Sequence, residues 1–198
     1  MGRVVVSNIV SLDLRYEGPG GNVMALNMDA AFDAYNFERI RSASVVLLGR
    51  RSFEGFSSYW PVIANAPEDP GNQALSAGNR ELSRIYDGLP KVVVSDSYVV
   101  PADNPWAGTT TVIRRDGVRP WLESDGRSLS GDVLVFASRT MWTALLAHGG
   151  VDELHLMVGP RVLGGGTPLF TEPADLRLLE ARRFEGSDNV LLRYAPAR

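Results

Sequence analysis

The sequence contains no cysteine, only two histidines and a single lysine. The absence of cysteine excludes disulfides, thiolate metal sites and cysteine nucleophiles. Two histidines, His148 and His155, give little support to a zinc site or a histidine-based catalytic triad, so we predict no metal. Because Lys91 is the only lysine, arginine carries almost all the positive charge. Arginine suits the recognition of phosphate and carboxylate groups, although GC-rich coding would also enrich it.

The chain also lacks a long apolar run and a strong net charge. No stretch reaches the roughly 20 apolar residues of a membrane span, and a net charge of −3 argues against a nucleic-acid partner held by electrostatics. Residues 1–15 continue in a strand-like pattern without a small-residue cleavage site, so we interpret them as structure rather than as a signal peptide. The 198 residues, 44% of them hydrophobic, suit one domain spanning 1–198. We expect a cytoplasmic protein with no membrane partner.

Short apolar segments rich in β-branched residues recur along the chain and predict strands. Three of these segments, 45–48, 91–95 and 133–136, are almost wholly apolar, which is typical of strands covered on both faces. The other predicted strands are 3–12, 109–113, 153–158, 176–184 and 190–194. The last two predict a terminal hairpin.

Helices are predicted between these strands. One covers 29–41 with Asp29 as its N-cap, and another runs from a Ser138 cap through His148 and ends at a glycine pair. Shorter helical segments are expected at 51–56, 81–86 and 118–124. Residues 61–80, rich in proline and glycine, predict a long loop that shapes a pocket or a dimer contact. The order predicts one α/β domain with a mostly parallel sheet and an antiparallel C-terminal edge.

Three of the apolar strands end on small residues close to a helix start: Gly49, Ser95 and the pair Ala137-Ser138. In open α/β sheets, ligands bind beyond the carboxyl ends of the strands. Helix N-termini at that edge offer free N–H groups and a partial positive charge to phosphate. The pattern therefore favours a phosphate-bearing ligand, although any α/β protein contains such turns.

Longer motifs carry a more specific signal. SLD near the N-terminus is followed, in order, by LLGRRSFEGFSSYWP, KVVVS, GDVLVFASRTMWTALLAHGGVDELHLMVGPRVLGGGTPLF and NVLLRYAP. Together they resemble the reductase-domain family of riboflavin biosynthesis, which has the dihydrofolate reductase-like fold. The resemblance runs from about residue 3 to residue 196. It implies a twisted, mixed, eight-stranded sheet flanked by helices, with an antiparallel C-terminal hairpin.

The resemblance also implies an activity. Members of this family transfer hydride from NADPH to a conjugated C=N bond of a pyrimidine- or pteridine-like ring, and they often form homodimers. The chain resembles a stand-alone member, because it carries no zinc-deaminase motif. We therefore expect an NAD(P)H-dependent oxidoreductase acting on a small heteroaromatic pterin-, flavin- or pyrimidine-like substrate. The alternatives are a non-catalytic dinucleotide-binding module on the same fold and a pure interaction partner.

The resemblance assigns the cofactor to four segments of this chain. Gly49, Arg50, Arg51 and Ser52 would receive phosphate, with exposed arginines as the alternative. Ser95 and Asp96 would lie near the adenosine 2′-phosphate, where relatives have a basic residue. A carboxylate there repels phosphate and suits a free 2′-hydroxyl, so NADH remains an alternative to NADPH unless Asp96 faces solvent.

The third segment, Ala137, Ser138, Arg139 and Thr140, replaces a glycine-containing pair of relatives that touches the pyrophosphate. Alanine tolerates a tight turn there only where φ is negative. The fourth, Leu163, Gly164, Gly165, Gly166 and Thr167, would lie beside the cofactor and substrate cleft, with a flexible turn as the alternative.

Catalytic and substrate-binding residues are also expected by resemblance. Asp13 in SLD is the candidate proton donor, although Leu14 replaces the usual glycine and a strand-end turn role is the alternative. Tyr59 and Trp60 would wall the substrate pocket or pack in the core, and Gly166 would contact substrate. Asp152, Glu153, His148 and His155 are interpreted as structural.

Overall fold

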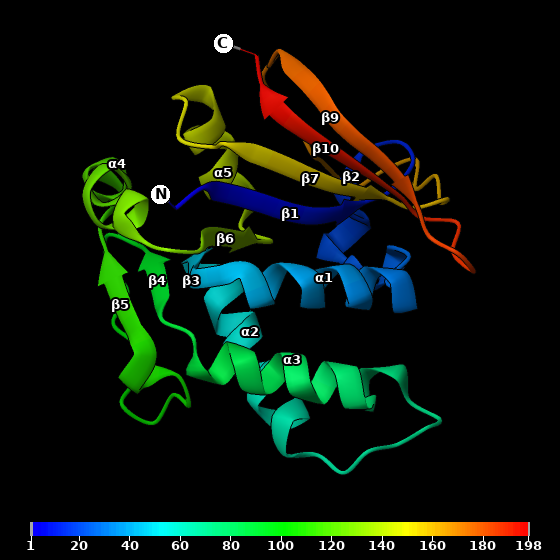
Figure 1. Cartoon of the computed structure of the whole chain (residues 1–198), viewed down its shortest axis with the longest axis horizontal. Helices are drawn as coiled ribbons and strands as arrows, with labels where there is room; N and C mark the ends of the chain where they lie inside the picture. The colour runs from blue at the N-terminus through cyan, green and yellow to red at the C-terminus, as the bar shows by residue number, and fades with distance from the viewer. Residues whose placement is uncertain (1, 198) are drawn as a thin grey trace.

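The computed structural model describes residues 2–197, which form an eight-stranded mixed sheet with helices on both faces (Figure 1). The strands are β1 Val4–Val10, β2 Arg15–Glu17, β3 Ala43–Gly49, β4 Lys91–Val94, β5 Thr110–Ile113, β6 Asp132–Phe136, β7 Glu153–Val158, β8 Thr167–Pro168, β9 Leu176–Arg183 and β10 Val190–Pro196. The α-helices are α1 Ala30–Ser42, α2 Arg50–Asn65, α3 Ala77–Gly88, α4 Val118–Trp121 and α5 Arg139–Ala147.

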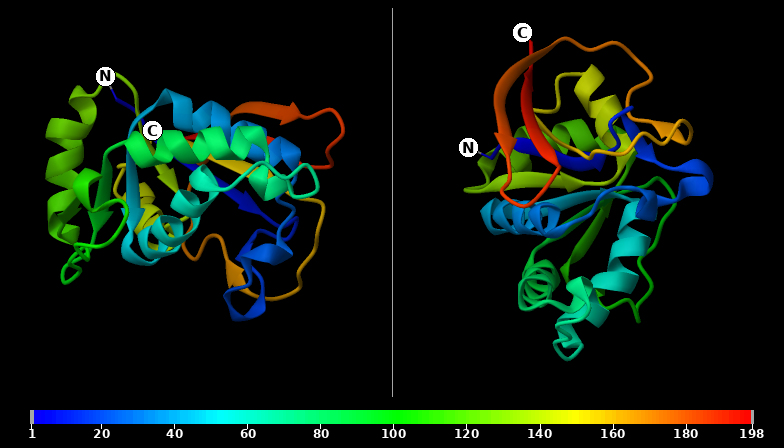
Figure 2. Two further views of the ribbon diagram at one scale, coloured as in Figure 1. Left: turned by 90° about the horizontal axis from the view of Figure 1, so that it is seen from below. Right: turned by 90° about the vertical axis from the view of Figure 1, so that its right-hand side faces the viewer.

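The order across the main sheet is β5-β4-β3-β6-β1-β7-β10-β9. All neighbours from β5 to β7 are parallel, whereas β10 pairs antiparallel with both β7 and β9. The predicted mixed sheet with an antiparallel C-terminal hairpin is confirmed. A separate two-stranded ribbon, β2 with β8, brings the glycine-rich 163–166 loop beside the N-terminal loop (Figure 2).

Alternation along the central strands builds a core on each face of the sheet. Val5, Leu48 and Val93 face α1, α2 and α3, where they meet Phe53 and Tyr86. Their neighbours along the same strands face α5 and the α4 region instead. Because both sets of side chains are buried, these strands read as continuous apolar runs. None of the helices in residues 2–197 has the length and apolarity of a membrane span.

The first helix begins as predicted. The Asp29 carboxylate accepts hydrogen bonds from the N–H groups of Ala31 and Phe32, both at 3.1 Å, and so caps α1.

The predicted loop over residues 61–80 is wrong. Helix α2 continues through Pro61 to Asn65, and α3 already begins at Ala77 with Ser76 as its N-cap. The irregular segment therefore shrinks to 66–76, including a short 3-10 turn at Gln73–Leu75. Packing overrides the proline signal, because Trp60 stacks on Tyr86 of α3 with ring centroids 5.3 Å apart.

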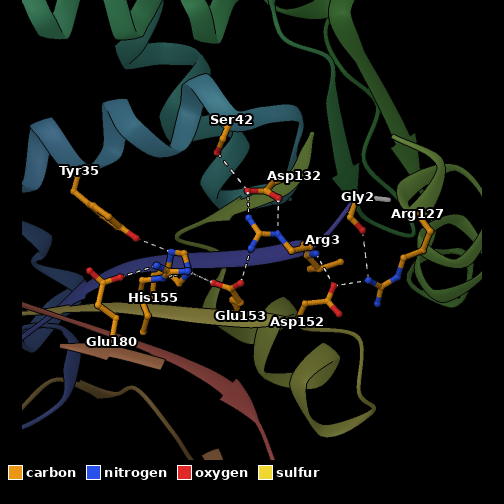
Figure 3. Close-up of polar contacts among 12 residues, drawn as sticks. Gly2, Arg3, Tyr35, Ser42, Arg127, Asp132, Asp152, Glu153, His155 and Glu180 are labelled. Carbon is orange, nitrogen blue, oxygen red and sulfur yellow. Dashed lines mark hydrogen bonds and ion pairs between the residues drawn. The ribbon is translucent and has the colours of Figure 1, made fainter. Parts of the chain in front are cut away.

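An ionic network connects the N-terminal ends of the neighbouring strands β1, β6 and β7 (Figure 3). Arg3 donates to Asp132 at 3.1 Å and to Glu153 at 2.6 Å. The fully buried His155 lies between the Tyr35 hydroxyl, 2.8 Å from Nδ1, and the Glu153 carboxylate, 2.8 Å from Nε2. These contacts agree with a structural role for Glu153 and His155.

Candidate functional site

The carboxyl ends of β3, β4 and β6 open onto one cleft of about 1200 Å³. Gly49, Ser95 and Ser138, which follow or end these strands, all line it. The strands are parallel neighbours, so their ends meet at the same edge of the sheet. The predicted convergence of three strand ends is therefore present. The volume exceeds the roughly 300–1,000 Å³ typical of small-molecule sites and suits an extended ligand.

Two serines connect the walls of this cleft. The Ser138 hydroxyl accepts a hydrogen bond from the Gly49 N–H at 3.0 Å, and the Ser52 hydroxyl accepts one from the Ser138 N–H at 3.0 Å. We call this pair of bonds the serine crossover. Ser138 occupies the predicted N-cap position of α5, but its hydroxyl makes no capping hydrogen bond, and Ser52 lies within α2 without capping it. Each is used to hold the neighbouring turn instead.

The turn into α5 is strained. Ala137 and Ser138 have φ values of 47° and 56°, so Ala137 makes the tight turn with a positive φ, the conformation that alanine is not expected to tolerate. Non-glycine residues in this region cost roughly 1–3 kcal/mol each and persist only where their surroundings impose the conformation. The serine crossover provides that constraint at Ser138. The first N–H groups of α5, those of Arg139 and Thr140, have no partner within the helix and border the cleft.

Gly49 is not required by the protein's own packing. Its φ is −75°, and an added Cβ would meet nothing nearer than the Ser138 side chain at 3.9 Å. The space in front of Gly49 therefore belongs to the cleft. A bare backbone at a helix start beside open space is the arrangement that lets a phosphate approach closely.

Arginines supply the positive charge of the cleft. Those lining it are Arg50, Arg51, Arg115, Arg119, Arg127 and Arg139. The single lysine, Lys91, is buried and does not contribute. Arg50 pairs with Glu54 at 2.9 Å and lies over the Tyr98 ring, whereas the exposed Arg51 has no ion pair within residues 2–197. The donor set of arginines, hydroxyls and helix N–H groups fits a ligand with several phosphates.

Both carboxylate oxygens of Asp13 accept hydrogen bonds from the glycine-rich loop that begins at Leu163. Its Oδ1 accepts from the Leu163 N–H and its Oδ2 from the Gly164 N–H, both at 3.0 Å. The Leu163 N–H and the Ser11 hydroxyl chiefly hold the pKa of this carboxyl well below its usual range. Asp13 therefore stays ionised, and it does not border the cleft. Its geometry favours the structural alternative over proton donation.

The expected substrate-pocket residues are not brought together. Trp60 packs against Tyr86, Tyr59 immediately before it in α2 is half exposed, and neither borders the cleft. Leu163, Gly164, Gly165 and Gly166 also lie outside its lining. Gly166 has a φ of 98°, and an added Cβ would overlap the carbonyl oxygen of Glu17. This glycine is thus required by the packing of the loop against the chain after β2.

The cleft also contains Tyr16 and Glu17, which the sequence did not single out, and Thr167 of the fourth predicted segment. Tyr16, Glu17 and Thr167 come from the β2–β8 ribbon. The Thr167 hydroxyl donates to Glu17 Oε1 at 2.7 Å. Burial raises the pKa of Tyr16 to about 12, so its hydroxyl stays protonated.

Comparison with known proteins agrees with the fold. The chain is 25% identical over 185 residues to the uncharacterized protein YyaP of Bacillus subtilis, covering 92% of this chain and 89% of YyaP. Form 1 of Acinetobacter baumannii RibD superposes with a TM-score of 0.69 at 19% identity, over 100% of this chain and 59% of that one.

A second structure comes from Thermotoga maritima and is named diaminohydroxyphosphoribosylaminopyrimidine deaminase/5-amino-6-(5-phosphoribosylamino)uracil reductase. It superposes with a TM-score of 0.62 at 15% identity over 99% of this chain. The chain spans 57% of this protein, little more than half its length. These likenesses confirm the expected dihydrofolate reductase-like fold. The sequence pattern of the RibD C-terminal domain matches residues 3–192, and the chain belongs to that family.

Proposed function

We propose that this protein is a reductase that uses a nicotinamide dinucleotide, NADPH in preference to NADH, to reduce a conjugated C=N bond of a pterin-, flavin- or pyrimidine-like ring. The observation that carries the proposal is the convergence of Gly49, Ser95 and the strained residue Ser138 on one arginine-lined cleft. Such a cleft has the shape and charge for a ligand with a pyrophosphate and two flanking rings. Family membership and the reductase named in the Thermotoga protein support the same activity.

Different residues along the cleft would contact different parts of the dinucleotide. The α5 N-terminus would hold pyrophosphate through the backbone N–H groups of Arg139 and Thr140. Arg51, without an ion pair in the described chain, would add a charge-assisted contact. Strain at residues 137 and 138 keeps these donors aimed before the ligand arrives, so binding requires little reorganisation.

The chemistry divides between ligand and protein. A bound dinucleotide supplies the hydride. The protein must supply a proton to the reduced nitrogen or hold a water that does so. Asp13 is held ionised by the glycine loop and lies outside the cleft. We therefore assign to Glu17, whose carboxylate borders the cleft and accepts the Thr167 hydroxyl, the second of these roles: it would hold a water that delivers the proton and is reprotonated from solvent. The substrate would lie at this end, beside the β2–β8 ribbon.

Two measurements test the proposal. Thermal unfolding with and without each dinucleotide reports binding, because a ligand at a hundred times its Kd stabilises the folded state by about 2.7 kcal/mol. Loss of absorbance at 340 nm with a panel of pterins, flavins and pyrimidines reports turnover. Binding without turnover on any of them would favour the non-catalytic module. Failure of both dinucleotides to bind would overturn the proposal.

A further inference from the structure

Asp96 is paired with Arg115 through both of its oxygens. Oδ1 accepts the Arg115 backbone N–H at 3.0 Å, and Oδ2 accepts the Arg115 Nε–H at 2.6 Å. The backbone bond, followed by the guanidinium, lowers the pKa of Asp96, so the pair is ionic at neutral pH. Asp96 follows β4 and Arg115 follows the adjacent strand β5, so the sheet itself places them together.

This pairing leaves the outer part of the guanidinium available. Within residues 2–197, the terminal nitrogens of Arg115 hydrogen-bond no other group, and 79% of its side chain is exposed. Arg115 and Asp96 line the cleft together with Ser95, Ser97 and Arg119. Of these, Arg119 is already engaged by Glu123 at 2.8 Å. Arg115 is thus a held guanidinium with two free donor groups at the β4–β5 end of the cleft.

We propose that Arg115 is the residue that selects a 2′-phosphorylated dinucleotide, by donating its terminal N–H groups to that phosphate. This inference rests on the proposed function and names a specificity determinant within the same cleft. A carboxylate after this strand, taken alone, would repel a 2′-phosphate and accept a ribose hydroxyl instead. Here the carboxylate is neutralised and serves to orient the cation. A planar guanidinium fixed at Nε matches a phosphate with two parallel hydrogen bonds.

The test compares Kd values for NADPH and NADH by calorimetry in four proteins: the wild type, Arg115→Ala, Arg114→Ala and the double variant Arg115→Ala/Asp96→Asn. Arg114 is the matched control, because it is the neighbouring residue, pairs with Asp116 at 3.6 Å and does not border the cleft. The NADH affinity in each variant reports whether the cleft is intact. Neither readout requires a substrate.

We expect the wild type to bind NADPH more tightly than NADH. Arg115→Ala should weaken NADPH binding by about ten- to a hundredfold, because NADPH loses the charged hydrogen bonds to its 2′-phosphate. NADH has no 2′-phosphate, so its affinity should change little. The change exposes the Asp96 charge, so adding Asp96→Asn should recover part of the NADPH affinity. Arg114→Ala should keep the wild-type ratio.

Three results would overturn the inference, and they separate it from the proposed function. If Arg115→Ala keeps the wild-type ratio, or shifts it no more than Arg114→Ala does, the cleft binds dinucleotides but Arg115 does not select them. If the wild type binds NADH more tightly, Asp96 acts as a ribose acceptor despite its partner. If neither dinucleotide binds the wild type, the proposed function fails and this inference fails with it.

Discussion

The Ser52 hydroxyl accepts the backbone N–H of Ser138 across 86 residues of sequence. Through this bond the first turn of α2 supports the strained residue that opens α5, while the Ser138 hydroxyl supports Gly49 in return. Two helix starts that would each serve as an anion site are thereby joined into one surface.

Substitution of Gly49 by alanine should separate ligand binding from stability. An added Cβ meets only the Ser138 side chain at 3.9 Å, so the free energy of unfolding should fall by no more than about 1 kcal/mol, the scale of an N-cap change. Dinucleotide affinity should fall at least tenfold, because the methyl group occupies the approach to the helix start. Urea denaturation and calorimetry give the two quantities. Equal affinity in the variant and wild type would place the phosphate elsewhere.

Replacing Ala137 by glycine should stabilise the protein. The alanine has a φ of 47°, a region that glycine enters without steric cost, so a gain of about 0.5–1 kcal/mol is expected. Ala144→Gly within α5 is the matched control and should lose about 1 kcal/mol, because glycine is unfavourable in a helix interior. A urea midpoint above the wild-type value for Ala137→Gly, with a midpoint below it for Ala144→Gly, would agree with strain at Ala137. Midpoints below the wild-type value for both variants would argue against a strained turn.

The sequence was informative where local patterns decide structure and uninformative where packing decides it. The apolar runs ending at Gly49 and Ser95 predicted both strands and the edge at which they meet. The proline- and glycine-rich stretch over 61–80 predicted a loop, but α2 continues to Asn65, with Trp60 stacked on Tyr86. Glu17 lies at the cleft because β2 pairs with β8, which is distant in the sequence, and no local sequence pattern predicts that pairing. Arg115 could have been predicted as a site residue, because it follows a predicted strand whose carboxyl end lies at the same edge of the sheet.

Glu17→Gln should impair turnover more than binding. The glutamine keeps an acceptor for the Thr167 hydroxyl but cannot relay a proton to the held water, so kcat should fall by about 10²–10⁴ with dinucleotide affinity changed little. Steady-state kinetics on any active substrate, with Kd measured in parallel, checks this.

Asp13→Asn is the comparison for Glu17→Gln. It should lower the melting temperature, because two loop N–H groups lose a charged acceptor. A large kcat loss in Asp13→Asn at unchanged melting temperature, with Glu17→Gln active, would reverse the two assignments.

Stability should decline at acid pH through the buried His155 group. Burial is the main cause that lowers the pKa of His155 to about 4, below the roughly 6.5 of an unfolded histidine. Since the unfolded state binds this proton first, stability is full above about pH 6.5 and falls as pH drops toward 4. Urea denaturation between pH 7 and pH 4 measures the loss.

Glu153 extends the loss of stability below that range. Burial alone would raise its pKa, but hydrogen bonds from Arg193 and His155 and the charge of Arg3 together lower it to about 2. Its contribution is therefore present above about pH 4.3, the pKa of an unfolded glutamate, and is lost toward pH 2. His155→Gln should flatten the pH 4–6.5 part of the profile. A slope there equal to that of the wild type would exclude the histidine as its source.

The register of the parallel strands sets the dimensions of the cleft. Gly49 lies opposite Val94, and β3 has β4 on one side and β6 on the other. Adjacent strands lie about 4.8 Å apart, so the turns after β4, β3 and β6 stand at successive steps of that length along the sheet edge. The hydrogen-bond ladder between the strands, and not the loops, therefore sets the distances between the groups that contact the ligand. Loop sequences can change the groups that touch the ligand, while the spacing between its anchoring points stays constant.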